Sequence, residues 1–382
     1  MAEPDSVNTA VRVLVIGTDT SIFQAGAEAR SRVAAYGRLF DAYQVIVMSA
    51  PGFREETLEG GARLYPTNSR WFFLRPFDAV RIGRQIARPH GIDAISAQDP
   101  AESGLAGWLL KRATGLPLHI QLHADFFSPH FRRNSWKERL RYWLARFMVP
   151  RGDAFRVVSQ RIKRSLDSGF KIPHSPIMVL PIFVDRERFA NAKPSFDLHQ
   201  RYPELDFIIL MVSRLVREKN FGLALEAFAD LLKEFPKAGL IIVGDGPERK
   251  NLESRIQYLE LTGRVKLEGW QSDLTSYYKT ADLYLLTSNF EGYGRSVVEA
   301  AASGLPILMT DVGVAGELIR DGETGRIVLA RDRPALMRAL LEARRNYPEM
   351  RRMAEKAQAE VLALEPRTWE EYLTAYRRAF SF

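Results

Sequence analysis

Two glutamates, Glu291 and Glu299, stand eight positions apart in the segment Ser-Asn-Phe-Glu-Gly-Tyr-Gly-Arg-Ser-Val-Val-Glu-Ala. The glycines after Glu291 predict a turn, and the residues that follow predict a helix with Glu299 just over one turn inside it. A helix N-terminus binds anions through its N–H groups and dipole, and carboxylates accept hydrogen bonds from hydroxyls. The segment therefore suits a polyol attached to a phosphate. On spacing alone, the pair is as well explained as a solvated helix face.

Three further groups of residues follow predicted strands in the same half of the chain: Arg214 with Lys219, Gly244 with Gly246, and Gly313 to Glu317. The donors of Arg214 and Lys219 could neutralise a diphosphate without a metal. Each group alone is also compatible with an ordinary surface loop. Because ligands of parallel α/β sheets bind at the carboxyl ends of the strands, the sequence predicts that these loops meet at one sheet edge.

Short apolar runs alternate with helical patterns, which is typical of parallel sheets covered by helices. The chain has 382 residues, enough for two such domains. The first series of predicted strands is Val11 to Ile16, Gln44 to Met48, Ala94 to Ala97, Leu118 to Leu122, Phe155 to Ser159 and Ile177 to Leu180. The second is Phe207 to Val212, Leu240 to Val243, Val265 to Leu267, Leu283 to Leu286, Pro306 to Thr310 and Gly325 to Val328.

The predicted domains are doubly wound, Rossmann-like parallel sheets that face each other across a ligand-binding cleft. The first covers residues 1–185 and the second residues 186–366, with a polar, proline-containing linker over 185–206. Residues 367–382 predict a closing amphipathic helix.

Composition narrows the classes of function. The chain has no cysteine, which excludes disulfides, thiolate catalysis and cysteine-bound metals and is consistent with a reducing cytoplasm. The net charge of +8 favours an anionic partner. No nucleic-acid-binding motif is recognisable, so we expect no nucleic-acid partner. No apolar run approaches a membrane span, and the N-terminus has no signal-peptide pattern. We expect a cytoplasmic protein.

Together these motifs resemble the retaining glycosyltransferases of the family-4, GT-B type. The Glu, seven residues, Glu signature of that family matches Glu291 and Glu299. Its Ser-Arg and Lys pair matches Arg214 and Lys219, its Gly-x-Gly-Pro turn matches Gly244 to Pro247, and its glycine-rich stretch ending in Glu matches Gly313 to Glu317. Four motifs in the family's order are more specific than any one of them.

The resemblance is looser in the first half. The family's double glycine after the first strand appears as Ala25-Gly26, so only Gly26 is a candidate near the donor diphosphate. Its histidine after the fourth strand matches His123. Its Pro-Asn-Gly-Val-Asp appears as Pro181-Ile-Phe-Val-Asp185, which lacks Asn-Gly.

The resemblance implies transfer of a hexose from a nucleotide-diphosphate sugar to an acceptor hydroxyl, with retention and with neither metal nor cofactor. It makes Glu291 and His123 the catalytic candidates, with His123 orienting the sugar. Glu299 would accept the ribose hydroxyls, and the other donor-binding candidates are Arg214, Lys219, Gly246, Gly292, Tyr293, Gly294, Arg295, Ser296, Gly26 and Glu317. A nucleotide-sugar epimerase, a phosphorylase and a non-catalytic sugar-nucleotide-binding protein share the architecture and stay open as alternatives.

A lipid-linked or surface-polysaccharide glycan is the acceptor that we expect, on the inner face of a membrane. Residues 126–147 combine aromatic and basic side chains as interfacial helices do, with an apolar stripe at Trp136, Leu140, Trp143 or Leu144, and Phe147. The same stripe could instead be buried against the sheet. We expect Phe126, Phe127 and Phe131 to be the better candidates for contact with an anionic membrane.

Overall fold

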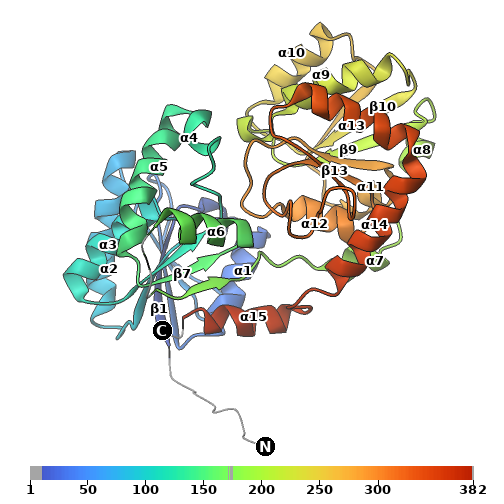
Figure 1. Cartoon of the computed structure of the whole chain (residues 1–382). Helices are drawn as coiled ribbons and strands as arrows, with labels where there is room; N and C mark the ends of the chain where they lie inside the picture. The colour runs from blue at the N-terminus through green and yellow to red at the C-terminus, as the bar shows by residue number, and fades with distance from the viewer. Residues whose placement is uncertain (1–10, 171, 173–174, 381–382) are drawn as a thin grey trace, which may run out of the picture. The chain divides into compact units, whose positions relative to one another are not determined.

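The computed structural model describes residues 11–170, 172 and 175–380. Contacts between residues divide the chain into two compact units (Figure 1). Unit 1 contains the chain up to Phe127, Ser135–Leu180 and the segment from Glu370 on, and unit 2 contains Ser128–Asn134 and Pro181–Trp369. The predicted linker at 185–206 lies within unit 2, where it carries two short helices.

The sheet of unit 1 has eight strands in the order β3-β4-β2-β1-β5-β6-β7-β8. All neighbours pair in parallel except β3 and β4. The strands are β1 (Arg12–Gly17), β2 (Ala42–Val47), β3 (Glu56–Thr57), β4 (Arg63–Pro66), β5 (Ala94–Ala97), β6 (Leu118–Leu122), β7 (Ala154–Val157) and β8 (Ile177–Val179). The sequence predicted six of them and missed β3 and β4.

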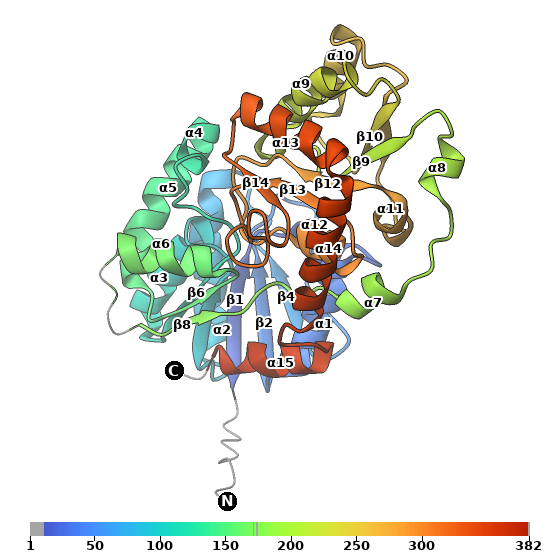
Figure 2. The ribbon, with the colours of Figure 1, turned by 45° about the vertical axis from the view of Figure 1, so that its right-hand side comes forward.

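Helices cover both faces of this sheet (Figure 2). They are α1 (Glu28–Gly37), α2 (Arg75–Ala87), α3 (Glu102–Thr114), α5 (Trp136–Met148), α6 (Gln160–Gly169) and α15 (Trp369–Arg378), the last beginning in unit 2. Alternate strand residues face opposite sides. Gln121 Nε2 of β6 donates to Tyr376 OH of α15 at 3.1 Å. Leu118 of the same strand faces α3, where a Cβ on Gly107 would lie 2.6 Å away.

The predicted C-terminal helix is α15, and it completes the core of unit 1. The Tyr36 and Tyr376 rings stack with centroids 4.1 Å apart. Between helix and sheet lies Arg156 of β7, which is 2% exposed. Its Nη1 donates to Gln121 Oε1 at 2.8 Å, and its Nη2 donates to Tyr372 OH at 2.8 Å and to the Leu180 carbonyl at 3.1 Å. Arg156 of β7 therefore links α15 to Gln121 of β6 and to the backbone just after β8.

Unit 2 has a six-stranded parallel sheet in the order β11-β10-β9-β12-β13-β14. Its strands are β9 (Phe207–Val212), β10 (Ala238–Val243), β11 (Val265–Gly269), β12 (Leu283–Leu286), β13 (Ile307–Thr310) and β14 (Arg326–Val328). Its helices are α7 (Arg186–Asn191), α8 (Leu198–Arg201), α9 (Phe221–Leu232), α10 (Arg249–Tyr258), α11 (Thr275–Thr280), α12 (Arg295–Ala302), α13 (Arg333–Arg345) and α14 (Tyr347–Leu362), and α4 (Phe131–Asn134) is grouped with this unit.

The predicted fold class, two parallel-sheet α/β domains, is confirmed. Each sheet buries continuous apolar strands such as Phe207–Val212, as expected for parallel sheets covered on both faces. Within the described residues, no helix is both long and apolar enough to span a bilayer.

Candidate functional site

The loops that follow β9 and β12 are bonded to each other at the carboxyl edge of the unit 2 sheet. The backbone N–H of Asn289 donates to the Glu218 carbonyl at 2.7 Å, and Thr287 Oγ1 donates to the Lys219 carbonyl at 2.9 Å. These bonds hold the backbone at Lys219 close to the turn that carries Glu291. As predicted, the loop of Lys219 and the loop of Glu291 meet at one sheet edge.

Glu291 forms an ion pair with Lys219 and accepts a hydrogen bond from Ser288 Oγ at 2.7 Å. Both charged side chains are mostly buried, with 13% of Glu291 and 16% of Lys219 exposed. Burial strengthens the attraction between them, because solvent screens it less. The sequence placed Lys219 on a diphosphate and Glu291 on a sugar ring; the structure joins the two side chains directly.

Glu299 lies inside α12 and is 6% exposed. Its Oε2 accepts a hydrogen bond from Tyr278 OH at 2.9 Å, and its Oε1 lies 3.7 Å from Arg295 Nη2. Burial, and then the charge of Glu299, hold the pKa of Tyr278 well above its ordinary value. The phenol therefore stays protonated and donates to the carboxylate across the physiological range.

The N-terminus of α12 has no side-chain cap, and its N-cap residue is Gly294 with φ of +95°. Tyr284 OH donates to Ser296 Oγ at 2.6 Å and so positions the first turn. The Tyr293 side chain is buried, with 5% exposed, so mainly the backbone of this residue is accessible to a nucleotide sugar. This uncapped helix start, with Arg295 and Ser296 as its first residues, is a suitable place for an anion.

The loop after β13 packs onto the same turn. Gly313 has φ of +56°, and a Cβ there would lie 2.4 Å from the Tyr293 carbonyl and 3.0 Å from Glu291 Cβ. The Val314 N–H donates to the Tyr293 carbonyl at 3.0 Å, and Glu317 follows in the next turn, partly exposed. Glycine is therefore required at position 313 for the loops to approach each other.

Gly244 and Gly246 have a similar structural role. Gly244 has φ of +133°, and a Cβ on it would lie 1.9 Å from the Ser213 carbonyl. The Leu215 N–H donates to the Asp245 carbonyl at 2.9 Å, which fastens the glycine turn to the loop that carries Arg214. Arg214 itself is exposed, and in the described part of the chain its guanidinium has no ion-pair partner. It stands free to meet an anion, unlike Lys219.

The two site candidates of unit 1 lie after its strands. Gly26, in the turn before α1, is exposed with φ of +78°. His123 follows β6, is partly buried, and has its Nε2 3.3 Å from Gln98 Oε1. Burial, and next the charge of Arg156, lower the pKa of His123 to about 3. The imidazole is neutral at physiological pH, so it can hold a hydroxyl by hydrogen bonds but carries no charge.

His119, within β6, is fully buried, and burial also lowers its pKa to about 3. Below about pH 6.5 the imidazole takes up a proton in the unfolded chain but stays neutral in the folded one. Protonation therefore favours the unfolded state in this range of pH. We expect the fold to lose stability as the pH falls from 6.5 towards 3. In His119→Gln, the free energy of unfolding should therefore vary less between pH 6.5 and 4 than in wild type or in the exposed control His90→Gln.

The measurement is urea unfolding at several pH values, together with NMR titration of the imidazole resonances. A His119 or His123 ring that titrates between pH 5 and 8 would contradict the prediction.

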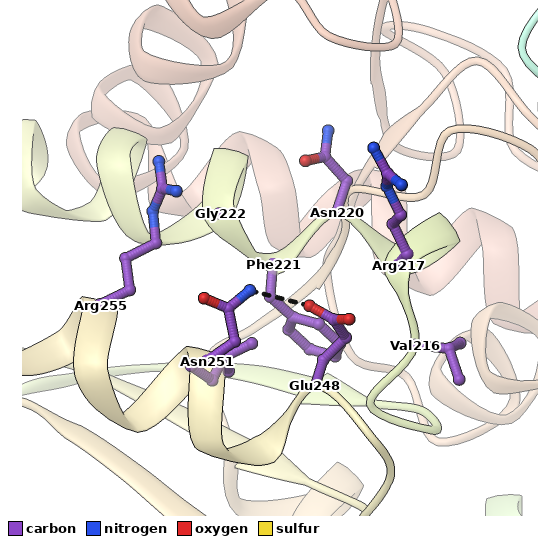
Figure 3. Close-up of a pocket in the computed structure, with 9 residues that line it drawn as sticks. Val216, Arg217, Asn220, Phe221, Gly222, Glu248, Asn251 and Arg255 are labelled. Atoms are coloured by element: carbon purple, nitrogen blue, oxygen red, sulfur yellow. Dashed lines mark hydrogen bonds between the residues drawn. The ribbon is translucent and has the colours of Figure 1, made fainter. Parts of the chain in front are cut away.

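Sequence reasoning missed a polar pocket of about 400 Å³ beside the turn at Arg217 (Figure 3). Its lining combines the starts of α9 and α10, with the Arg217 and Arg255 side chains on its rim and Asn251 Nδ2 donating to Glu248 Oε2 at 2.9 Å. It also missed the partners Tyr278, Ser288 and Tyr284. Among the residues with described positions, no group of His, Asp and Glu side chains is arranged as a metal site.

Comparison with known proteins finds one family match in each half of the chain. The family described as "Glycosyl transferases group 1" matches residues 197–360, and "Glycosyltransferase Family 4" matches residues 38–188. Alpha-D-kanosaminyltransferase of Streptomyces kanamyceticus is 29% identical over 65% of this chain and 67% of its own length. Alpha-monoglucosyldiacylglycerol synthase of Streptococcus pneumoniae is 28% identical over 70% of this chain, and the match spans only 62% of that relative.

Solved structures share the fold at low identity. Sucrose-phosphate synthase from Thermosynechococcus elongatus superposes with a TM-score of 0.79 at 19% identity, covering 97% of this chain and 99% of that one. Anabaena HepE, solved in complex with UDP and glucose, superposes with a TM-score of 0.72 at 19% identity, covering 97% and 98% of the two chains.

Proposed function

Because this chain is a glycosyltransferase of the group 1, family-4 type with the GT-B fold, we propose that it moves a hexose from a nucleoside-diphosphate sugar to an acceptor hydroxyl, with retention at the anomeric carbon. One observation carries this proposal: Glu291, paired with Lys219, lies in the turn that leads into the uncapped start of α12, while Glu299 is held within that helix. The HepE complex with UDP and glucose supports UDP as the nucleotide to test first.

The proposed chemistry follows from the charges at this sheet edge. The bond between the anomeric carbon and the β-phosphate oxygen breaks, and the acceptor oxygen bonds to the same face of the carbon. The departing phosphate takes the acceptor proton. Its growing negative charge is stabilised by Arg214, by Lys219 and by the N–H groups that begin α12, more in the transition state than in the ground state.

No metal or cofactor is assigned to this step. Lys219 would exchange part of its ion pair with Glu291 for the diphosphate, which would leave the Glu291 carboxylate to accept hydrogen bonds from the sugar. Glu299, oriented by Tyr278, would accept those of the ribose. His123 would orient the sugar as a neutral imidazole rather than act as the main base.

The acceptor that we propose is a lipid-linked or surface-polysaccharide glycan, met at the cytoplasmic face of a membrane. Support comes from the Streptococcus pneumoniae relative, whose name describes a glucosyldiacylglycerol synthase. The charge of +8 also suits an anionic acceptor or surface.

The test is to screen UDP-, GDP- and ADP-sugars for thermal stabilisation of the purified chain, then to measure nucleotide release with and without glycan acceptors. We expect a donor present at about 100 times its dissociation constant to add roughly 2.7 kcal/mol to the free energy of unfolding. Nucleoside diphosphate should be released only when an acceptor is present. Isomerised nucleotide sugar without acceptor would instead identify an epimerase, and binding without any turnover a non-catalytic protein.

A further inference from the structure

Helix α5 of unit 1 turns an apolar stripe outward. The stripe consists of Trp136, Leu140, Trp143 and Phe147, which are 48 to 65% exposed and recur at helical spacing. The opposite side of the helix packs inward, because Ala145 and Met148 are buried. Arg141, at the helix side, donates from Nε to Glu102 of α3 at 2.9 Å. Burial of the stripe on the sheet, one of the two readings of the sequence, is therefore wrong.

The aromatic loop that the sequence favoured as the membrane contact is also not available. Phe126 and Phe131 are each 3% exposed. Phe127 is partly buried, with its ring centroid 4.7 Å from that of Phe170 and 6.1 Å from that of Tyr142. These rings stabilise the loop, and the expectation that they contact a membrane is corrected.

A second exposed cluster lies where the 3-10 helix η2 (Phe72–Leu74) joins α2. Trp71, Phe72, Phe73 and Phe77 are 54 to 69% exposed there. Nothing in the sequence reading drew attention to this cluster. So many large aromatic side chains in one short exposed segment exceed the scattered apolar residues of an ordinary surface and indicate an interaction site.

Both clusters lie on helices of the same layer of unit 1. Helices α2 and α5 each pack on α3, on the side of the sheet opposite α15 (Figures 1 and 2). The stripe continues onto α3, because the Trp108 and Phe147 rings meet with centroids 6.0 Å apart. Arg112, exposed on α3, lies over the Trp108 ring at 5.4 Å.

Exposed basic side chains surround the aromatic ones. On α5 they are Lys137, Arg139 and Arg146, and around the second cluster they are Arg70 and Arg84. Arg81, also exposed there, is paired with Asp78, with its Nε 3.8 Å from Oδ1. The acidic residues nearby are already engaged: Glu138 accepts a hydrogen bond from Ser135, and Asp78 accepts one from Ser69. The face therefore combines apolar side chains that can enter a nonpolar phase with cations that seek anions.

We propose that the α5 stripe and the Trp71–Phe77 cluster together form a docking face for an anionic lipid bilayer. Aromatic side chains with flanking Arg and Lys on an exposed helix suit the boundary between headgroups and acyl chains, and the cations add attraction to anionic lipid. A second copy of the chain is disfavoured as the occupant, because a twofold contact would bring identical cations together. The inference rests on the proposed function only for its purpose, which is to bring the enzyme to a lipid-linked acceptor.

The test is co-sedimentation of the full chain with vesicles of phosphatidylcholine, with and without phosphatidylglycerol, at low and high salt. We expect binding to the anionic vesicles that weakens as salt rises. Trp136→Ala with Trp143→Ala should weaken it about tenfold or more, and so should Phe72→Ala with Phe73→Ala. Tyr258→Ala, which removes an 85% exposed ring from unit 2, is the matched control and should bind as wild type does.

Wild type that does not sediment with anionic vesicles would overturn the proposal, as would aromatic variants that bind equally well. A dimer in sedimentation velocity that the same variants dissociate would assign the face to a second copy instead. Donor stabilisation in solution is measured alongside. If it persists in the variants, the loss belongs to the docking face alone; if wild type lacks it, the proposed function fails whatever the vesicles show.

Discussion

Glu291→Gln is expected to turn over donor about 100-fold or more slowly than wild type, because it removes a positioning charge whose contact with the sugar tightens in the transition state. Its affinity for bare nucleoside diphosphate should not fall. Lys219 is paired with Glu291, so the neutral glutamine leaves the ammonium more available to phosphate. Single-turnover kinetics and calorimetric titration of the nucleotide measure the two quantities separately.

Glu299→Gln provides the contrast. This carboxylate accepts from Tyr278 and is proposed to hold the ribose, so its loss should weaken the binding of bare nucleotide as well. Equal losses of bare-nucleotide affinity in the two variants would contradict the division of roles. A Glu291→Gln enzyme with wild-type turnover would remove Glu291 from the reaction altogether.

Arg156→Met is expected to lower the free energy of unfolding of unit 1 by about 3–5 kcal/mol. The guanidinium is buried and donates to Gln121, Leu180 and Tyr372, so its removal leaves acceptors in the core without their donor. A methionine fills much of the volume but supplies none of these hydrogen bonds. Thermal unfolding and urea titration, followed by tyrosine near-UV signals from α15, report the change.

The matched control is Arg88→Met, which changes an exposed arginine of the same unit and should stay within about 0.5 kcal/mol of wild type. A loss in Arg156→Met no larger than in this control would mean that Arg156 does not anchor α15. Wild-type proteolytic resistance around residues 369–378 in Arg156→Met would point the same way.

The alternation of buried strands and helices was readable because parallel strands covered on both faces are continuously apolar, as in Phe207–Val212. Two strands, β3 and β4, were not predicted from this pattern. Glu56–Thr57 has two residues and is not buried, and Arg63–Pro66 ends in a proline. Such strands exist because of their neighbours, since Arg63 to Pro66 pair with Gln44 to Val47.

The loops of the candidate site were found because glycines and charged residues follow strands, which is a local pattern. Their partners were not found. Tyr278 reaches Glu299 from another helix 21 residues earlier, and Lys219 reaches Glu291 across 72 residues. No spacing rule connects such positions. Likewise, periodicity identified an apolar stripe at Trp136 to Phe147, but only the packing of Ala145 and Met148 decides which side of the helix faces solvent.

The return of α15 to unit 1 also bears on how the chain folds as it is synthesised. Tyr376 meets Tyr36 and Gln121 only after the whole of unit 2 has left the ribosome, because residues 181–369 lie between the segments of unit 1. Part of one sheet face in the N-terminal half therefore stays uncovered during synthesis, while the C-terminal half can already fold around its own core. We expect unit 2 to reach its native state first during translation, the reverse of the usual order from the N-terminus.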